Sequence, residues 1–520
     1  MNGKTYKYER NNSTSNDVRW ADPDEFKNAA TIKQIHVDAG ECPACGLPVI
    51  SDGRTVYVDN SDTHTIILGS TGSKKTRNIV MPLLNMAALA GESVIVTDPK
   101  GEIYDACSGF FASMGYEQYV LNFRDPAQSD CWNPLFDAYK LYHSGKTDQA
   151  VSLLNDFINI CAEPQKMNVK DTYFIDNACS YFLAYLLVFI ETALPVEVNI
   201  SNFFNFFLSH SSPEATEEIC QCLAERSIAS LNLMGVLTNK IADKTFANVA
   251  SCVSVMLNPF ITRRALCQLL SKSSFDTKNI TQKKTVIFVI VPDEKTSLHF
   301  LVTAFIKQTY EMLIYEAQQQ ETKKIPVRLN YILDEFGNIP TVADMPAMIS
   351  AARSRNIRFF LCIQDIQQLI HKYGNDANTI MGNCENWVFL ISRDIETLQR
   401  ISNLCGGIKF YDADGKSDNR PLISISELQH LQKGEALIIH GRHYPLVSLL
   451  PDISEYCFKT YPKISLMRRQ LPSIIPFNID ILLAEIKKGE KPLLFWAEVS
   501  DHEIFIDNKK EKEKDTIFDW

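Results

Sequence analysis

The sequence has no excess of positive charge. Its 520 residues include 52 Lys and Arg against 62 Asp and Glu, which gives a formal net charge of −10 at pH 7. Lys and Arg hold the phosphate backbone, so a protein that binds nucleic acid over a broad surface is basic there. The composition excludes DNA binding by bulk attraction. Any such contact has to be made through a local ring or channel of basic side chains.

Long hydrophobic runs are also missing. The longest apolar stretch, Tyr181–Ile190, stops at Glu191 after ten residues, whereas a membrane-spanning helix needs about 20. Residues 1–17 are polar and lack the apolar core of a secretory signal. The 14 cysteines are scattered along the chain, which is typical of a reducing compartment. We therefore expect no transmembrane segment and a cytoplasmic location.

A second Cys-x-x-Cys pair is absent as well. The one pair, Cys42-Pro-Ala-Cys45, has the spacing of a zinc knuckle, but a structural zinc site needs four ligands. His36, His64 or a neighbouring chain could complete the set. Cys42 and Cys45 are thus zinc candidates, and free or structural cysteines are the alternative.

The length and the pattern of apolar runs predict two folded domains, since one core rarely extends beyond about 300 residues. Short buried runs alternate with helical stretches in two separate parts of the chain, which favours an α/β fold with a mostly parallel sheet. Helical periodicity alone fills the part between them. The expected divisions are an N-terminal extension with little core (1–50), a discontinuous nucleotide-binding domain (51–146 and 276–462), an all-α inserted domain (147–275) and a C-terminal tail (463–520).

A phosphate-binding loop is expected between the strand that ends at Leu68 and the helix that follows. The sequence Gly69-Ser-Thr-Gly-Ser-Lys-Lys-Thr76 fits the pattern G-x-x-x-x-G-K-[ST] at all but one position. Lys75 would reach the β- and γ-phosphates of ATP, and the Thr76 hydroxyl would bind Mg²⁺. The predicted nucleotide-binding residues are Gly69, Ser70, Thr71, Gly72, Ser73, Lys74, Lys75, Thr76 and Arg77.

The exception is Lys74, which stands where the last glycine of the pattern is expected. Glycine there lets the backbone approach phosphate and adopts conformations that are costly for other residues. Lys74 could strain the loop, or it could add a second positive contact to the nucleotide. Nucleotide binding is expected in either case, and turnover depends on which effect prevails.

Paired carboxylates end a second apolar strand, which is expected over Val327–Leu333. Asp334 is expected to hold the Mg²⁺ shell, and Glu335 to orient and deprotonate the attacking water. Gln364 follows the next strand and would sense the γ-phosphate or position water. Arg353 lies at a helix end, where it could stabilise transition-state charge at a neighbouring subunit's nucleotide; a solvated helix terminus is the alternative.

In their order along the chain these features resemble the TraG/TrwB family of type IV coupling proteins, which are conjugative DNA-transfer ATPases. The resemblance covers about residues 50–450. It is carried by Gly69–Thr76, Thr97-Asp-Pro-Lys-Gly-Glu102, Trp132-Asn-Pro-Leu135, Ile290-Val-Pro-Asp293, Leu333-Asp-Glu-Phe-Gly-Asn338, Arg353, Gln364 and Tyr373-Gly374. The family's N-terminal membrane helices have no counterpart here, and Gly46-Leu-Pro48 is similar to the stretch that follows them.

The resemblance implies a RecA-like ATPase with an all-α insertion that uses ATP and Mg²⁺ and forms hexamers. By position, Lys75 and Thr76 match the phosphate-loop pair, Asp334 and Glu335 the second acidic motif, and Arg353 the trans-acting arginine.

Implied partners are single-stranded DNA bound to a relaxase, the components of a type IV secretion channel and a separate membrane-anchoring protein. The chain would then lie at the cytoplasmic face of the bacterial membrane. One alternative stays open: a weakly hydrolysing ATP-binding scaffold that presents substrates, proteins included, to the channel. A chromosome-type translocase of double-stranded DNA would share the motor motifs, but the Asn-Pro-Leu motif and the helical insertion do not support it.

Overall fold

The computed structural model describes residues 18–40, 42–166, 169–223, 227–238, 243–292, 296–411 and 417–487. The chain divides into two compact units. Unit 1 comprises residues 1–130 and 274–469, and unit 2 comprises residues 131–273 and 470–520. Asp293 of the Val-Pro-Asp motif and the predicted tail beyond Lys487 lie outside the described residues.

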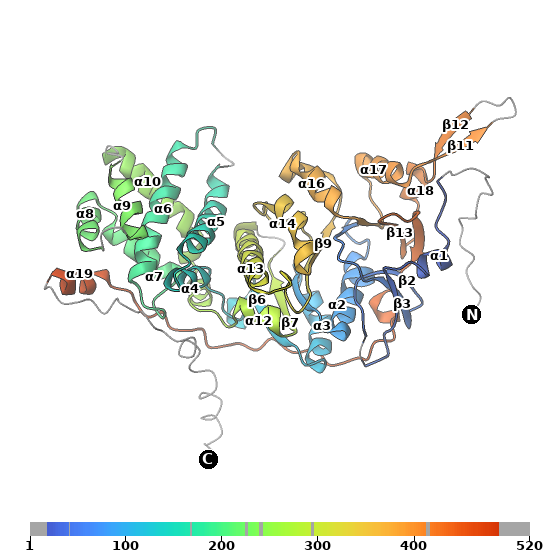
Figure 1. The fold of residues 1–520 in the computed structure, drawn as a ribbon, viewed down its shortest axis with the longest axis horizontal. Helices are drawn as coiled ribbons and strands as arrows, with labels where there is room; N and C mark the ends of the chain where they lie inside the picture. The colour runs from blue at the N-terminus through green and yellow to red at the C-terminus, as the bar shows by residue number, and fades with distance from the viewer. Residues whose placement is uncertain are drawn as a thin grey trace, which may run out of the picture. The chain divides into compact units, whose positions relative to one another are not determined.

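A nine-stranded sheet forms the centre of unit 1 (Figure 1). The strand order is β14-β13-β10-β4-β9-β8-β5-β7-β6. Every neighbouring pair from β10 to β6 is parallel, and β13 and β14 add antiparallel partners at one side. This confirms the predicted α/β fold with a mostly parallel sheet. The bounds are β4 (Thr65–Leu68), β5 (Ser93–Thr97), β6 (Glu117–Asn122), β7 (Thr285–Ile290), β8 (Leu329–Leu333), β9 (Ile357–Ile363), β10 (Asn386–Phe389), β13 (Glu435–His440) and β14 (Leu446–Leu449).

The central strands are buried along their whole length. Every residue of β4, β5, β7, β8 and β9 is buried, as expected for parallel strands with both faces covered. That burial explains why they read as short continuous apolar runs in the sequence.

Helices and one hairpin connect these strands. The hairpin pairs β11 (Gly407–Tyr411) with β12 (Ser417–Pro421). The helical elements of unit 1 are α1 (Pro23–Lys27), η1 (Thr76–Val80), α2 (Met81–Ala90), α3 (Glu102–Ser113), η2 (Pro126–Gln128), α12 (Thr277–Gln282), η3 (Thr296–Leu298), α13 (His299–Gln319), α14 (Met345–Ala352), η4 (Arg353–Arg355), α15 (Gln367–Tyr373), α16 (Asp376–Asn383), α17 (Ile395–Cys405), α18 (Ile425–Gln429) and η5 (Ile453–Glu455).

The region expected to be an N-terminal extension with little core instead supplies two strands of a second, three-stranded sheet. Its strands β1 (Ile32–His36), β2 (Leu47–Ser51) and β3 (Thr55–Asp59) are antiparallel in the order β1-β3-β2. Phe26, Ile35 and Val49 are fully or almost fully buried in the same apolar cluster as α2. The expectation for residues 1–50 is therefore wrong for residues 26–50. β3 needs strand partners for its backbone, and the short, partly polar β1 and β2 supply them.

The two zinc candidates are buried cysteines of this N-terminal part. The Cys42 thiol donates to the His36 carbonyl at 3.7 Å, and the Cys45 thiol to the Leu83 carbonyl at 3.8 Å. Burial raises the pKa of both thiols. Among the described residues no group of three or more His, Cys, Asp or Glu side chains could hold a metal ion. The structure thus favours the alternative, buried structural cysteines.

Unit 2 is helical, with no strand among its described residues. It begins at Cys131, earlier than the predicted boundary at 147, and also takes in residues 470–487 of the predicted tail. Asn133 of the Asn-Pro-Leu motif holds its start, donating from Nδ2 to the Val198 carbonyl at 2.6 Å. The bounds are α4 (Phe136–His143), α5 (Thr147–Lys166), α6 (Tyr173–Thr192), α7 (Ile200–His210), α8 (Pro213–Cys222), α9 (Ile228–Thr238), α10 (Asp243–Ile261), α11 (Arg264–Leu269) and α19 (Ile479–Lys487).

Helix α6 of unit 2 is strongly apolar. Among the described residues, α6 alone is long and apolar enough to cross a membrane. In the structure 61% of its most apolar window is buried inside the protein. Phe182 and Phe189 pack against Phe203 of α7, with ring centroids 5.1 and 5.8 Å apart. These contacts are those of a core helix.

Candidate nucleotide-binding site

The phosphate loop extends from the end of β4 to the first turn of η1. Its start is fixed by the two flanking strands, since Gly69 N donates to the Ile363 carbonyl at 3.1 Å and Ser70 N to the Ile391 carbonyl at 2.9 Å. A Cβ atom at Gly69 would lie 2.5 Å from the Ser73 hydroxyl oxygen, so the turn requires glycine. Gly72 has a φ of +80°, which also favours glycine.

Lys75 and Thr76 follow the loop and face the acidic strand end. Lys75 is almost fully buried; its ammonium donates to the Gly69 carbonyl and lies 3.8 Å from Glu335 Oε1. The Thr76 hydroxyl donates to Asp334 Oδ2 at 3.0 Å. The structure thus brings together the two halves of the predicted site, which are more than 250 positions apart in the sequence.

Two carboxylates lie side by side at the carboxyl edge of the sheet. Thr97 of β5 pairs in register with Leu333 of β8, so Asp98 and Asp334 come next on adjacent strands. Burial is the main cause that raises the pKa of each carboxyl to about 6. Asp98 Oδ2 accepts a hydrogen bond from Tyr104 N at 2.8 Å, whereas its Oδ1 is buried with no hydrogen-bond partner in the described structure.

Glu335 is held from three directions. Its Oε2 accepts from Gln364 Nε2 at 3.1 Å and from Asn338 Nδ2 at 3.2 Å, and Lys75 lies on the Oε1 side. The backbone at Glu335 is left-handed, with a φ of +53°. Such conformations cost free energy outside glycine and gather at functional sites.

The position of Gln364 depends on a further residue, Gln368. Gln364 N donates to Gln368 Oε1 at 2.9 Å. A Cβ atom at Gly337 would lie 1.9 Å from that same oxygen. The glycine of the Leu-Asp-Glu-Phe-Gly-Asn motif therefore makes room for the side chain that fixes Gln364.

The Lys74 side chain extends from the phosphate loop to Asp452. The backbone at Lys74 is left-handed, with a φ of +69°, as expected where glycine is usual. Its ammonium donates to Asp452 Oδ2 at 2.8 Å, and Arg77 also binds this carboxylate. The hydrogen bonds from Arg77 and Lys74 hold the pKa of the Asp452 carboxyl well below its usual range.

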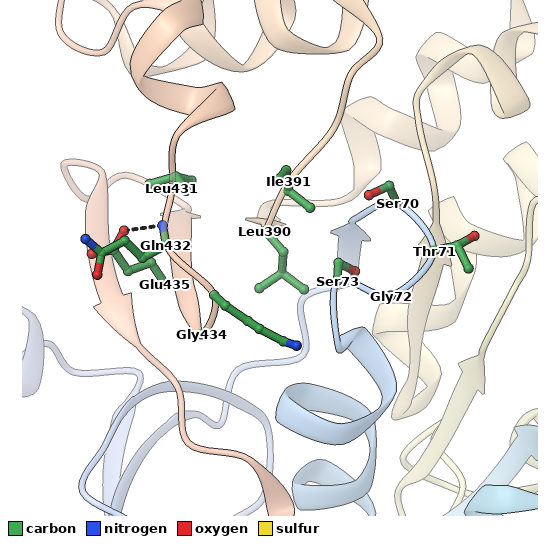
Figure 2. A pocket seen from close by; sticks show the side chains of 11 residues that line it. Ser70, Thr71, Gly72, Ser73, Leu390, Ile391, Leu431, Gln432, Gly434 and Glu435 are labelled. Carbon is green, nitrogen blue, oxygen red and sulfur yellow. Dashed lines mark hydrogen bonds between the residues drawn. The ribbon is translucent and has the colours of Figure 1, made fainter.

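A pocket of about 370 Å³ opens beside the phosphate loop. Figure 2 shows Ser70–Ser73 on one side, facing Leu390, Ile391 and the segment Leu431–Glu435. The volume lies in the range of small-molecule sites, and the apolar side chains of Leu390, Ile391 and Leu431 share the lining with polar and charged groups. Gln432 N donates to the Glu435 carboxylate at 2.7 Å, which fixes the far wall.

The comparisons with known proteins agree with this geometry. Residues 19–446 match the model of a family described as "Type IV secretory system Conjugative DNA transfer". The chain belongs to this family. Over 423 residues it is 21% identical to the conjugal transfer protein TraG of Escherichia coli. That match covers 75% of this chain and 64% of TraG, so the chain spans less than two thirds of this relative.

Solved structures of the coupling protein TrwB share the fold. The unbound form, TrwBdeltaN70, is 14% identical, with a TM-score of 0.53, and the match covers 81% of this chain and 91% of the solved one. TrwB in complex with ADP and Mg²⁺ is also 14% identical, with a TM-score of 0.53 over 84% of this chain and 96% of TrwB. The RecA-like P-loop fold expected for a member of the conjugative DNA-transfer family is thereby confirmed.

One predicted residue of this family member lies away from the cluster. Arg353 is in η4, directly before β9, whereas Gln364 follows the other end of this strand. β9 has seven residues, and at about 3.3 Å per residue its two ends are about 20 Å apart. The Arg353 side chain is 41% exposed, and its guanidinium lies 2.5 Å from Glu385 Oε1. Within one chain, Arg353 does not join the other site residues.

Sequence reasoning missed several residues that shape the site. Asp452, Gln368 and the Leu431–Glu435 wall belong to no phosphate-binding motif, and two of the three are more than 350 positions from the loop. Asn338 belongs to a family motif for which the sequence assigns it no role, and in the structure it contacts Glu335. Gly337 of the same motif is the one sequence feature that indicated a close contact, which the structure shows to be with Gln368.

Proposed function

We propose that this chain is the ATPase motor of a type IV coupling protein, which delivers relaxase-bound single-stranded DNA to a secretion channel. The observation that carries the proposal is one cluster at the carboxyl edge of the sheet. In it Lys75, Thr76 and Gln364 contact the Asp334–Glu335 pair at 3.0–3.8 Å. Membership in the conjugative DNA-transfer family supports the assignment.

The residues around Asp334 fit a magnesium ion. A hydroxyl and a carboxylate lie 3.0 Å apart at Thr76 and Asp334, and oxygen ligands are what Mg²⁺ prefers. Asp98 adds a buried carboxylate oxygen with no partner in the described structure. Thr76 and Asp334 would hold the ion, which when bound neutralises charge on the β- and γ-phosphates. TrwB, a protein of the same fold, has been solved with ADP and Mg²⁺.

The remaining polar residues would bind the phosphates of ATP or activate the attacking water. Lys75 and the loop N–H groups would hold the phosphates, because they present positive charge at a helix start. The Glu335 carboxylate would take a proton from the attacking water, and Gln364, fixed to it at 3.1 Å, would orient that water.

The pocket beside Ser70–Ser73 would take the nucleoside. It lies across the loop from Leu390, Ile391 and Leu431 (Figure 2), whose side chains offer apolar surface to a base. The phosphates would then extend toward Lys75, near the other end of the loop, and toward Glu335, which follows β8 and lies 3.8 Å from the Lys75 ammonium.

Arg353 would act on a neighbouring subunit's nucleotide. Its place before β9 separates it from the nucleotide site of its own chain, while its partial exposure leaves it accessible to another. This fits the hexameric ring expected of such motors. With a net charge of −10, DNA would be held through a local basic surface.

ATP binding and Mg²⁺-dependent hydrolysis test the proposal together. Lys75→Ala is expected to abolish turnover and weaken ATP binding, whereas Glu335→Gln is expected to lower turnover by about 10²–10³-fold and leave ATP binding nearly unchanged. Tight ATP binding without turnover in the unchanged protein, together with turnover in Lys74→Gly, would instead support the scaffold alternative. A protein that binds no nucleotide would overturn both.

A further inference from the structure

Three side chains, one near the end of the phosphate loop and two in the turn after it, contact one distant segment. Lys74 and Arg77 bind the Asp452 carboxylate, with donor–acceptor distances of 2.8 Å for Lys74 Nζ and of 2.9 and 2.5 Å for two Arg77 nitrogens. Asn78 Nδ2 donates to the Leu450 carbonyl at 2.9 Å. Arg77 and Asn78 lie in the first turn of η1 and Lys74 comes two residues before it, so the start of this helix is fastened to residues 450–452.

The distant segment is itself fixed. Asp452 is 6% exposed, and its Oδ1 also accepts hydrogen bonds from Ser454 N at 3.2 Å and Ser454 Oγ at 2.9 Å. Leu450 N donates to the Gly434 carbonyl at 2.9 Å, and Gly434 lines the pocket beside the loop. One segment thus supports both the outer side of the phosphate loop and the opposite pocket wall.

Lys74 is the residue in the loop that most needs such support. Its φ of +69° lies in the region that glycine adopts freely and lysine does not. A lysine released from Asp452 would gain by relaxing toward negative φ, which would turn the loop N–H groups away from their present direction. Its ammonium would also be free to bind a phosphate group of the nucleotide away from the position that the loop N–H groups set.

We propose that Asp452 is a positioning residue for the phosphate loop, which holds Lys74 in the left-handed conformation and keeps its ammonium outside the phosphate cradle. The proposal rests on the proposed nucleotide-binding function of the loop. A glycine would adopt the left-handed conformation at position 74 without strain. Lys74 adopts it while its side chain is held by Asp452, which is 378 positions away in the sequence. The importance of Asp452 therefore depends on the presence of Lys74.

This dependence is tested by combining Asp452→Asn with Lys74→Gly in the full chain. Asn keeps an oxygen that can accept from Ser454 but loses the charge that binds Lys74. Two quantities are measured: the hydrogen-exchange rate of the amides of residues 70–78 without nucleotide, and the Kd for ADP with Mg²⁺. In the unchanged background, Asp452→Asn is expected to raise the exchange rate and the Kd by at least about fivefold each. In the Lys74→Gly background the same substitution is expected to raise each by less than about twofold.

The two backgrounds separate a positioning role from a merely structural one. Arg77 still binds Asp452 in Lys74→Gly, so the residual effect there measures the share of Arg77. Lys74→Met, which keeps Asp452 and the left-handed position but removes the ion pair, is expected to copy Asp452→Asn. It also serves if Asp452→Asn lowers the yield of folded protein.

Equal effects of Asp452→Asn in the two backgrounds would overturn the proposal, as would no effect in the unchanged background. Failure of the proposed function looks different. A chain that binds no ADP would contradict the assignment of the loop, while hydrogen exchange would still report whether Asp452 holds Lys74.

Discussion

Replacing Asp334 by Asn is expected to stabilise the metal-free protein at neutral pH while removing a proposed Mg²⁺ ligand. The side chain is 5% exposed, and burial raises its pKa from 3.8 to about 6. A shift of about two units corresponds to about 3 kcal/mol, because one unit equals 1.36 kcal/mol. Asn has a similar shape and an oxygen that can accept from Thr76, but it has no charge to desolvate.

The sign of the pH dependence follows from the raised pKa. Below about pH 4 the carboxyl is protonated in both the folded and the unfolded chain, so Asp334 costs nothing. Between about pH 4 and 6 the unfolded chain releases this proton while the folded chain still holds it, so stability is lost over this range; above about pH 6 both are ionised and the loss stays constant. The gain from Asp334→Asn should therefore be small at pH 4, approach about 3 kcal/mol by pH 6 and change little between pH 6 and 8.

Urea unfolding of both proteins in EDTA, at pH 4, 6 and 8, measures this difference. Taking the difference between variant and unchanged protein at each pH cancels the titration of groups distant from the site. The same variant should bind ADP with Mg²⁺ more weakly. A variant that is less stable than the unchanged protein at pH 8, or equally affected at every pH, would refute the reasoning that burial dominates at Asp334.

Four further outcomes are expected. Glu335→Gln should lower ATP turnover by about 10²–10³-fold with ATP affinity nearly unchanged, which steady-state hydrolysis and equilibrium binding resolve. Lys74→Gly should stay within about 1 kcal/mol of the unchanged stability in urea, because relief of the left-handed backbone offsets the added chain entropy and the lost ion pair; Lys74→Ala, which keeps the strain, should lose up to about 1 kcal/mol. Mixing Arg353→Ala with Glu335→Gln subunits should restore turnover that neither shows alone, and intact mixed rings without activity would count against a shared site. Ile391→Trp, which fills the pocket, should raise the KM for ATP by about tenfold with kcat unchanged, as expected when binding is lost uniformly.

The parts that could be predicted from the sequence are those written in contiguous residues. The phosphate loop and the acidic strand end are short motifs next to buried apolar runs, so both the strands and the chemistry of the motifs could be predicted. Their meeting at Thr76 and Asp334, 3.0 Å apart, follows from the rule that parallel strands bring their carboxyl ends to one edge.

The parts that could not be predicted depend on contacts between distant residues. Nothing near Lys74 shows that Asp452 will bind its ammonium, and no motif marks Leu431–Glu435 as a pocket wall. The strands β1 and β2 are short and partly polar, so their role appears only once β3 is seen to need partners. The Cys42–Cys45 spacing suggested a metal because spacing alone does not show that both thiols are buried and bonded to backbone carbonyls.

The most direct test of the motor assignment is steady-state ATP hydrolysis with Mg²⁺, measured with and without single-stranded DNA, in the unchanged protein and in Lys75→Ala. The account predicts turnover that rises on adding single-stranded DNA and disappears in Lys75→Ala. Turnover that ignores DNA, or that survives in Lys75→Ala, would contradict it.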